Sequence, residues 1–176
     1  EALFTKENPD YAQSCNNLAG LYLSMKRYEK AEPLALEAHT TWEKTLDADD
    51  PVLAYSLTNL GQLYTAMKQF AKAEDYFQRA RPLWDSAVGR EHPSFISNSI
   101  DLGKLYWNTH QFNKADGYFT ESFTTQRKLT DKIFRFTNEA EKQQYLENIT
   151  GSTDDYYSFY SAAPFATQAA NPYQLS

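Results

Sequence analysis

Cysteine, glycine and long apolar runs are scarce in this chain, and each scarcity excludes a class of protein. Cys15 is the only cysteine among 176 residues, which excludes an internal disulfide framework and fits a reducing compartment such as the cytoplasm. Only 6 glycines are present, which argues against a fold rich in loops and β-turns. No apolar run approaches the roughly 20 residues of a membrane-spanning helix, so we expect no membrane partner.

Positive charge is also too sparse and scattered for nucleic acid to be the main partner. The formal net charge is −6, and lysines and arginines form no cluster of the kind that marks a nucleic-acid-binding surface. In contrast, hydrophobic residues make up 41% of the chain and aromatic residues 15%. This composition provides a core and excludes a disordered tail.

A 42-residue repeat organises most of the sequence. Pro9, Pro51 and Pro93 lie 42 residues apart, and the stretches that follow them are similar. At this spacing leucines, tyrosines and small residues coincide in three copies. They are Leu18, Leu60 and Leu102; Leu21, Leu63 and Leu105; Tyr22, Tyr64 and Tyr106; Ala19, Gly61 and Gly103; and Ala31, Ala73 and Ala115.

The spacing within each copy predicts two α-helices. Leu18, Leu21, Tyr22 and Met25 fall at i, i+3, i+4 and i+7, which makes one apolar stripe that we expect to be buried. A second stripe begins at Tyr28 and is separated from the first by a short polar link. We expect these links at residues 26–27, 68–69 and 110–111.

Helix starts and one expected break can also be located. Asn8 and Asp50 are good N-cap residues before a proline at the first helical position, whereas His92 is a poorer cap. Pro82 falls inside the second helix of the second copy, where it removes a hydrogen bond. We therefore expect a kink or break near residues 80–81.

The repeated residues resemble the tetratricopeptide repeat (TPR) of the kinesin-light-chain type. The resemblance rests on Leu–Ala/Gly–x–x–Tyr, an aromatic residue six positions later and then alanine, together with "NNLA" and "YEKAEPL". It implies an all-α fold, a right-handed solenoid of helix-turn-helix repeats with C-terminal capping helices. The expected repeats are residues 8–49, 50–91 and 92–131; residues 1–7 would end a preceding repeat.

From Thr130 the period fails. Asn138 and Glu141 form an N-x-x-E box that predicts a helix over residues 139–149, and a short helix carrying "YYSFY" is expected after Ser152. These capping helices, within residues 132–163, are expected to cover the end of the solenoid. The covering side chains would be Ile133, Phe134, Phe136, Tyr145 and Leu146.

Residues 134–160 are similar to the segment that joins TPR repeats to the CHAT domain in bacterial proteins. CHAT is a caspase-like cysteine-peptidase fold, so the resemblance implies that residues 164–176 begin a downstream region of this kind. The catalytic motifs of that family are not in this sequence.

Searching the chain for chemistry favours structural roles over catalytic ones. Cys15 could serve as a nucleophile with His39, His92 or His110 as base, but its place on a helix stripe favours a structural thiol. The histidines lack metal-ligand spacing, and "DADD" at residues 47–50 lacks the later glycine and glutamate of a calcium loop. We expect a non-catalytic fragment with no cofactor and no metal.

The surface with the most functional promise is the concave face, which the first helix of each pair should line. In peptide-binding TPR proteins the asparagine before the leucine often holds the ligand backbone, and the matching residues here are Asn17 and Asn59. Few charges face inward, which favours a neutral or mixed extended peptide over a carboxylate-binding site. The candidate binding residues are Gln13, Asn16, Asn17, Tyr55, Thr58, Asn59, Gln62, Asp101, Lys104, Trp107 and Asn108.

Two hypotheses therefore stand. In the first, the chain is a protein-interaction scaffold that binds a protein or peptide and presents it to, or regulates, a CHAT-type domain. In the second, it is a structural spacer or self-association module without a peptide ligand, in which Trp84, Trp107 and "YYSFY" could bury against a second copy.

Overall fold

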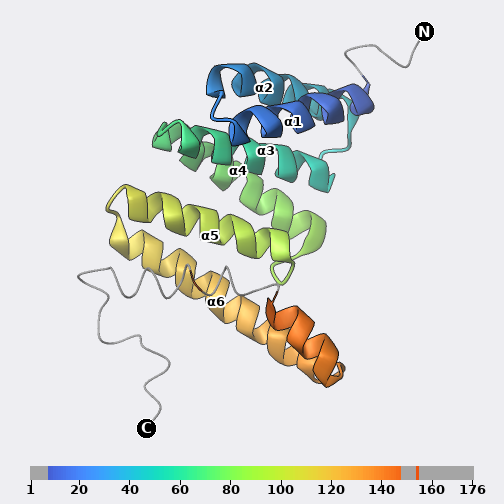
Figure 1. Ribbon diagram of the computed structural model, residues 1–176, viewed down its shortest axis with the longest axis vertical. Coiled ribbons are helices and arrows are strands. Elements are labelled where there is room, and N and C mark those ends of the chain that lie inside the picture. The colour runs from blue at the N-terminus through green and yellow to red at the C-terminus, as the bar shows by residue number, and fades with distance from the viewer. Residues whose placement is uncertain (1–7, 148–153, 155–176) are drawn as a thin grey trace.

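The computed structural model describes residues 8–147 and residue 154, and within them the chain forms stacked pairs of α-helices without any strand (Figure 1). The pairs follow one another in chain order, and residues 139–147 form a further helix. The expected pairing of two helices per repeat is confirmed. The paired helices are α1 (Pro9–Ser24) with α2 (Tyr28–Thr45), α3 (Pro51–Ala66) with α4 (Phe70–Val88), and α5 (Pro93–Asn108) with α6 (Phe112–Phe134).

The predicted N-caps form as expected. Asn8 Oδ1 accepts a hydrogen bond from the Asp10 amide at 2.8 Å, and Asp50 Oδ1 accepts one from the Val52 amide at 2.8 Å. His92 Nδ1 accepts from the Ser94 amide at 3.2 Å, a longer contact that agrees with its rank as the poorer cap.

Each link between paired helices contains a residue in the left-handed conformation, although none of them is glycine. Lys26, Lys68 and His110 have φ values of 56°, 58° and 60°. At the second link the Lys68 amide donates to the Thr65 carbonyl at 3.0 Å and the Gln69 amide to the Tyr64 carbonyl at 2.8 Å. These two bonds close the C-terminus of α3 as a Schellman motif, and the other two links repeat the pattern.

The break expected near residues 80–81 is wrong, and the alternative of a kink there stays a prediction. Helix α4 runs without interruption from Phe70 to Val88 with Pro82 inside it, and α2 likewise contains Pro33. Proline removes one backbone hydrogen bond, but burial of Phe77, Ala80 and Trp84 on the same helix stabilises the helical path.

Burial of the leucine stripe differs between the first copy and the other two. Leu60 and Leu102 are fully buried, whereas Leu18 is 39% and Leu21 is 56% exposed. The expectation that the first-copy stripe is buried is therefore wrong for these leucines and for Met25, which is 47% exposed. The reason is that α2 packs on α3 and α4 on α5, while no other described helix packs on the corresponding side of α1.

Successive repeats are joined by a recurring contact of tyrosine, glutamate and lysine. The Tyr64 hydroxyl donates to Glu32 at 2.8 Å and the Tyr106 hydroxyl donates to Glu74 at 2.6 Å, while Lys114 Nζ lies 4.7 Å from the centre of the Tyr106 ring. Burial, with the Glu74 hydrogen bond, raises the pKa of Tyr106 to about 12, and burial also raises the pKa of Tyr64. Both phenols therefore stay protonated and donate at neutral pH.

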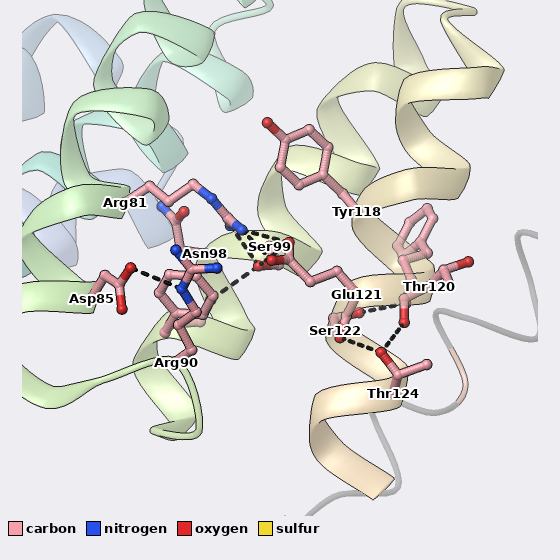
Figure 2. A network of polar contacts seen from close by, with 12 residues as sticks. Arg81, Asp85, Arg90, Asn98, Ser99, Tyr118, Thr120, Glu121, Ser122 and Thr124 are labelled. Carbon is pink, nitrogen blue, oxygen red and sulfur yellow. Dashed lines mark hydrogen bonds and ion pairs between the residues drawn. The ribbon is translucent and has the colours of Figure 1, made fainter. Parts of the chain in front are cut away.

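A second contact between the second and third repeats is centred on Arg81 (Figure 2). Its guanidinium donates to Ser99 Oγ at 2.7 Å and pairs with the Glu121 carboxylate. It also lies over the rings of Phe95 and Tyr118, 4.4 and 5.3 Å from their centres. The side chains of Arg81 and Glu121 are 20% and 33% exposed, so water screens this pair only in part.

We expect Glu121→Ala to lower the free energy of unfolding by roughly 1–2 kcal/mol, because a half-buried guanidinium loses its charged acceptor. Urea denaturation followed by circular dichroism measures the change. Glu91→Ala is the matched control, since Glu91 pairs with Lys132 at 3.3 Å but both side chains are more than half exposed. Equal losses in the two variants would contradict the role assigned to the Arg81 contact.

The C-terminal cap is confirmed in part. Asn138 Oδ1 accepts from the Glu141 amide and Glu141 Oε2 from the Asn138 amide, both at 3.0 Å, so the predicted capping box forms. The Tyr145 ring packs edge-on against Phe134 with centroids 6.3 Å apart. Phe136, however, is 86% exposed and Leu146 is 42% exposed, so the expected covering role is wrong for Phe136. The predicted "YYSFY" helix lies outside the described residues.

Candidate interaction surface

The first helices of the three repeats form one continuous face. The backbones of α1 and α5 both lie close to that of α3, whereas among the described helices α4 reaches α2 and α6 through long side chains, such as Arg79 with Glu43 and Arg81 with Glu121. The row of α1, α3 and α5 is therefore the tighter side of the stack, as expected for the inner side of a curved solenoid.

Amide side chains form hydrogen bonds across this inner row. Asn59 Nδ2 donates to Asn16 Oδ1 at 3.0 Å, which joins α3 to α1. Gln62 Nε2 donates to Asp101 Oδ2 at 3.0 Å, which joins α3 to α5, and Gln13 donates to Asn17 at 2.8 Å along α1. An amide offers two donor hydrogens and an acceptor oxygen, so one such bond uses only part of its capacity.

A pocket of about 280 Å³ opens between α1 and α3, and we call it the amide pocket. Five of the sequence-predicted residues line it: Asn16, Asn17, Tyr55, Asn59 and Gln62. The remaining lining residues are Gly20 and the apolar side chains of Ala19, Leu23, Ala35 and Leu63.

The other predicted residues lie elsewhere. Thr58 Oγ1 accepts a hydrogen bond from Trp84 Nε1 at 3.1 Å, so its side chain faces α4. Trp107 is half-buried and packs edge-on against Phe119, with ring centroids 6.3 Å apart. Lys104 and Asn108 are exposed on α5 and do not line the amide pocket.

Sequence reasoning missed the apolar part of the amide pocket. Ala35 belongs to the second helix of its repeat, and attention to the first helices alone excluded it. A signal was nevertheless present, because Ala35 is the counterpart of Phe77 and Phe119 at the 42-residue spacing.

Residues considered for chemistry have structural surroundings. Cys15 is 6% exposed in a cluster with Trp42 and Leu53, and His39 Nδ1 lies 2.7 Å from Ser56 Oγ. Over residues 8–147 and 154, no three His, Cys, Asp or Glu side chains come together in a way that would hold a metal ion. In the same part of the chain, no helix combines the length and apolarity needed to cross a membrane.

Comparison with solved structures gives similar helical solenoids. A crystal structure of a Podosopora anserina protein assigned as a kinesin light chain, with nearly identical TPR-like repeats, has a TM-score of 0.56 at 16% identity, covering 90% of this chain and 79% of that one. A single-site variant of that protein has a TM-score of 0.63 at 22% identity, covering 71% of this chain and 59% of the variant. BtubC (BKLC) from P. vanneervenii has a TM-score of 0.61 at 19% identity, covering 96% of this chain and 66% of BtubC.

These identities show similarity of fold alone. The chain spans 59% of the single-site variant and 66% of BtubC. No curated protein sequence matches.

The family model of the tetratricopeptide repeat matches residues 10–86 and 63–128. Repeats of this family are generally non-catalytic and bind protein partners. Because the two matches together cover well over half of the chain, the protein belongs to the tetratricopeptide repeat family, and its fold suggests a scaffold for protein–protein interaction.

Proposed function

We propose that this chain binds an extended peptide segment of a partner protein along the inner row, with the amide pocket as the central contact. The observation that supports this most is the pocket itself, in which an apolar interior is bordered by amide side chains from two helices. An extended peptide presents backbone amides and alternating side chains, and this border can match both.

The charge of the pocket favours a neutral contact. No Asp, Glu, Lys, Arg or His lines it, so no cation is placed to bind a ligand carboxylate. Tyr55 is 44% exposed at its edge and offers an aromatic surface beside the amides.

Substitution of the two asparagines tests the proposal. A peptide selected from a random dodecamer library on the wild-type chain serves as ligand, and calorimetry measures its affinity. We expect Asn17→Ala with Asn59→Ala to weaken binding by roughly 1–3 kcal/mol, because buried amide contacts are lost.

Asn113→Ala is the control, because it removes the same amide from an exposed position of α6. Circular dichroism must show an intact fold, since Asn59 also bonds to Asn16. Unaltered affinity in the folded double variant would exclude the inner row as the binding surface.

The second candidate function is a spacer or self-association module. The exposed Leu18 and Leu21 support it, because they offer apolar surface for contact with a second copy. Trp84, in contrast, is 7% exposed, so burial against a second copy is not its role. Mass in solution separates the two functions, because a dimer that hides the inner row would favour self-association. Presentation of a target to a CHAT-type domain stays a prediction, since residues 164–176, where that region would begin, lie outside the described residues.

A further inference from the structure

The amide pocket lies where the first repeat departs from the other two. At the 42-residue spacing, Phe77 and Phe119 occupy corresponding positions in α4 and α6, and both are 1% exposed. Ala35 takes this position in α2. The first repeat therefore lacks a benzyl side chain that the second and third repeats bury.

The residues that face these rings also differ between the first repeat and the other two. A Cβ built on Gly61 would lie 2.6 Å from atoms of the Phe77 ring, and one on Gly103 would lie 3.0 Å from the Phe119 ring. The ring in each of these repeats thus packs directly on glycine. Ala19 is the counterpart in the first repeat, and its methyl group replaces only a small part of the missing ring.

The opening of the pocket has a similar origin. Gln62 is the counterpart of Gly20, and its side chain reaches across to Asp101 on α5. Gly20 has no side chain with which to reach Asn59, and a Cβ built on it would have nothing within 4 Å. The junction between α1 and α3 is therefore left open at this position.

Size and polarity restrict what the pocket can take. An engineered apolar cavity of roughly 150 Å³ binds benzene, whereas sites for drug-sized ligands are usually larger than roughly 300 Å³. At about 280 Å³ the amide pocket suits one ring rather than a whole cofactor. Burying a charged side chain beside Ala19, Ala35 and Leu63 would be unfavourable, because no opposite charge lines the pocket.

From these observations we infer that the amide pocket receives an aromatic side chain, phenylalanine in the simplest case, from the bound peptide. This rests on the proposed function and adds the residue type that the peptide must carry. The ligand ring takes the volume that Phe77 and Phe119 fill in the neighbouring repeats.

The test rebuilds the packing of the second repeat in the first. Ala19→Gly with Ala35→Phe introduces the pair found at Gly61 and Phe77, so the ring and the space for it are introduced together. The probe is N-acetyl-phenylalanine methylamide, titrated into the 15N-labelled chain and followed by NMR; N-acetyl-lysine methylamide is the control probe. Saturable shifts at Ala19 and Ala35 are expected for the aromatic probe alone, and the folded double variant should bind it at least about tenfold more weakly.

Two further variants keep the result interpretable. Gly20→Gln introduces the side chain that Gln62 has in the second repeat, at a position where a Cβ meets nothing within 4 Å, so this variant should fold and should also bind the aromatic probe more weakly. Ala71→Phe places the same ring on an exposed position of α4 and should leave binding unchanged. Absence of saturation, equal binding of the lysine probe, or full binding to the folded filled variant would overturn the inference.

Library-selected peptides separate this inference from the proposed function. Peptides that depend on Asn17 and Asn59 but carry no aromatic residue, and bind the filled variant normally, would overturn the inference and leave the proposed function standing. If no peptide can be selected but the aromatic probe still binds, the proposed function is overturned. The inference that the ring comes from a bound peptide is then overturned as well. Aromatic peptides that lose affinity in the filled variant would support both.

Discussion

Replacing Phe77 by alanine is expected to lower the free energy of unfolding by about 3–5 kcal/mol. The Phe77 ring is 1% exposed and packs on Gly61, which has no side chain to occupy the vacated space. The substitution thus removes buried apolar surface and leaves a cavity. Urea denaturation of the 176-residue chain, followed by circular dichroism, measures the loss.

Phe136→Ala is the control for this result. Phe136 is 86% exposed, so the same truncation should change stability by less than about 0.5 kcal/mol. A similar loss in both variants would mean that the Phe77 ring is not the packed element described here.

The second large effect is expected at Gly61. Gly61→Leu should lower the free energy of unfolding by about 1–3 kcal/mol, because even its Cβ would lie 2.6 Å from the Phe77 ring and force the ring or helix α4 to move. Gly61→Ala should also destabilise the fold, by a smaller amount. Denaturation midpoints and slopes of the three proteins give the comparison.

Gly20→Ala is the matched control for the substitutions at Gly61. Both glycines lie within helices, but a Cβ on Gly20 meets nothing within 4 Å. Alanine is the better helix former, so Gly20→Ala should raise stability by roughly 0.5–1 kcal/mol. Stability is thus expected to fall on substitution of Gly61 and to rise on substitution of Gly20. Destabilisation by both would contradict the packing described.

Much of the fold was predictable because its determinants are local. The caps at Asn8 and Asp50 and the box of Asn138 with Glu141 depend on residues two or three positions apart, and all of them form. The break expected at Pro82 was also a local argument, and it failed because packing of the rest of α4 outweighs one missing hydrogen bond.

The candidate site was predictable only in part. Helical spacing placed Asn16, Asn17 and Asn59 on the inner row, and all three line the amide pocket. The same spacing placed Thr58 there, but Thr58 bonds to Trp84 on α4. The hydrogen bond from Asn59 to Asn16 spans 43 residues, and helical periodicity contains no information about such a contact.

The sequence by itself determined that this protein is a stack of helix pairs with a period of 42 residues, because the apolar spacing, caps and small residues of each helix are properties of neighbouring positions. Only the tertiary structure decided that Leu21 is exposed while Leu63 is buried, and that Ala35 and Gly20 leave a pocket open between α1 and α3. The physical reason is that burial and free volume depend on which side chains a second helix brings into contact.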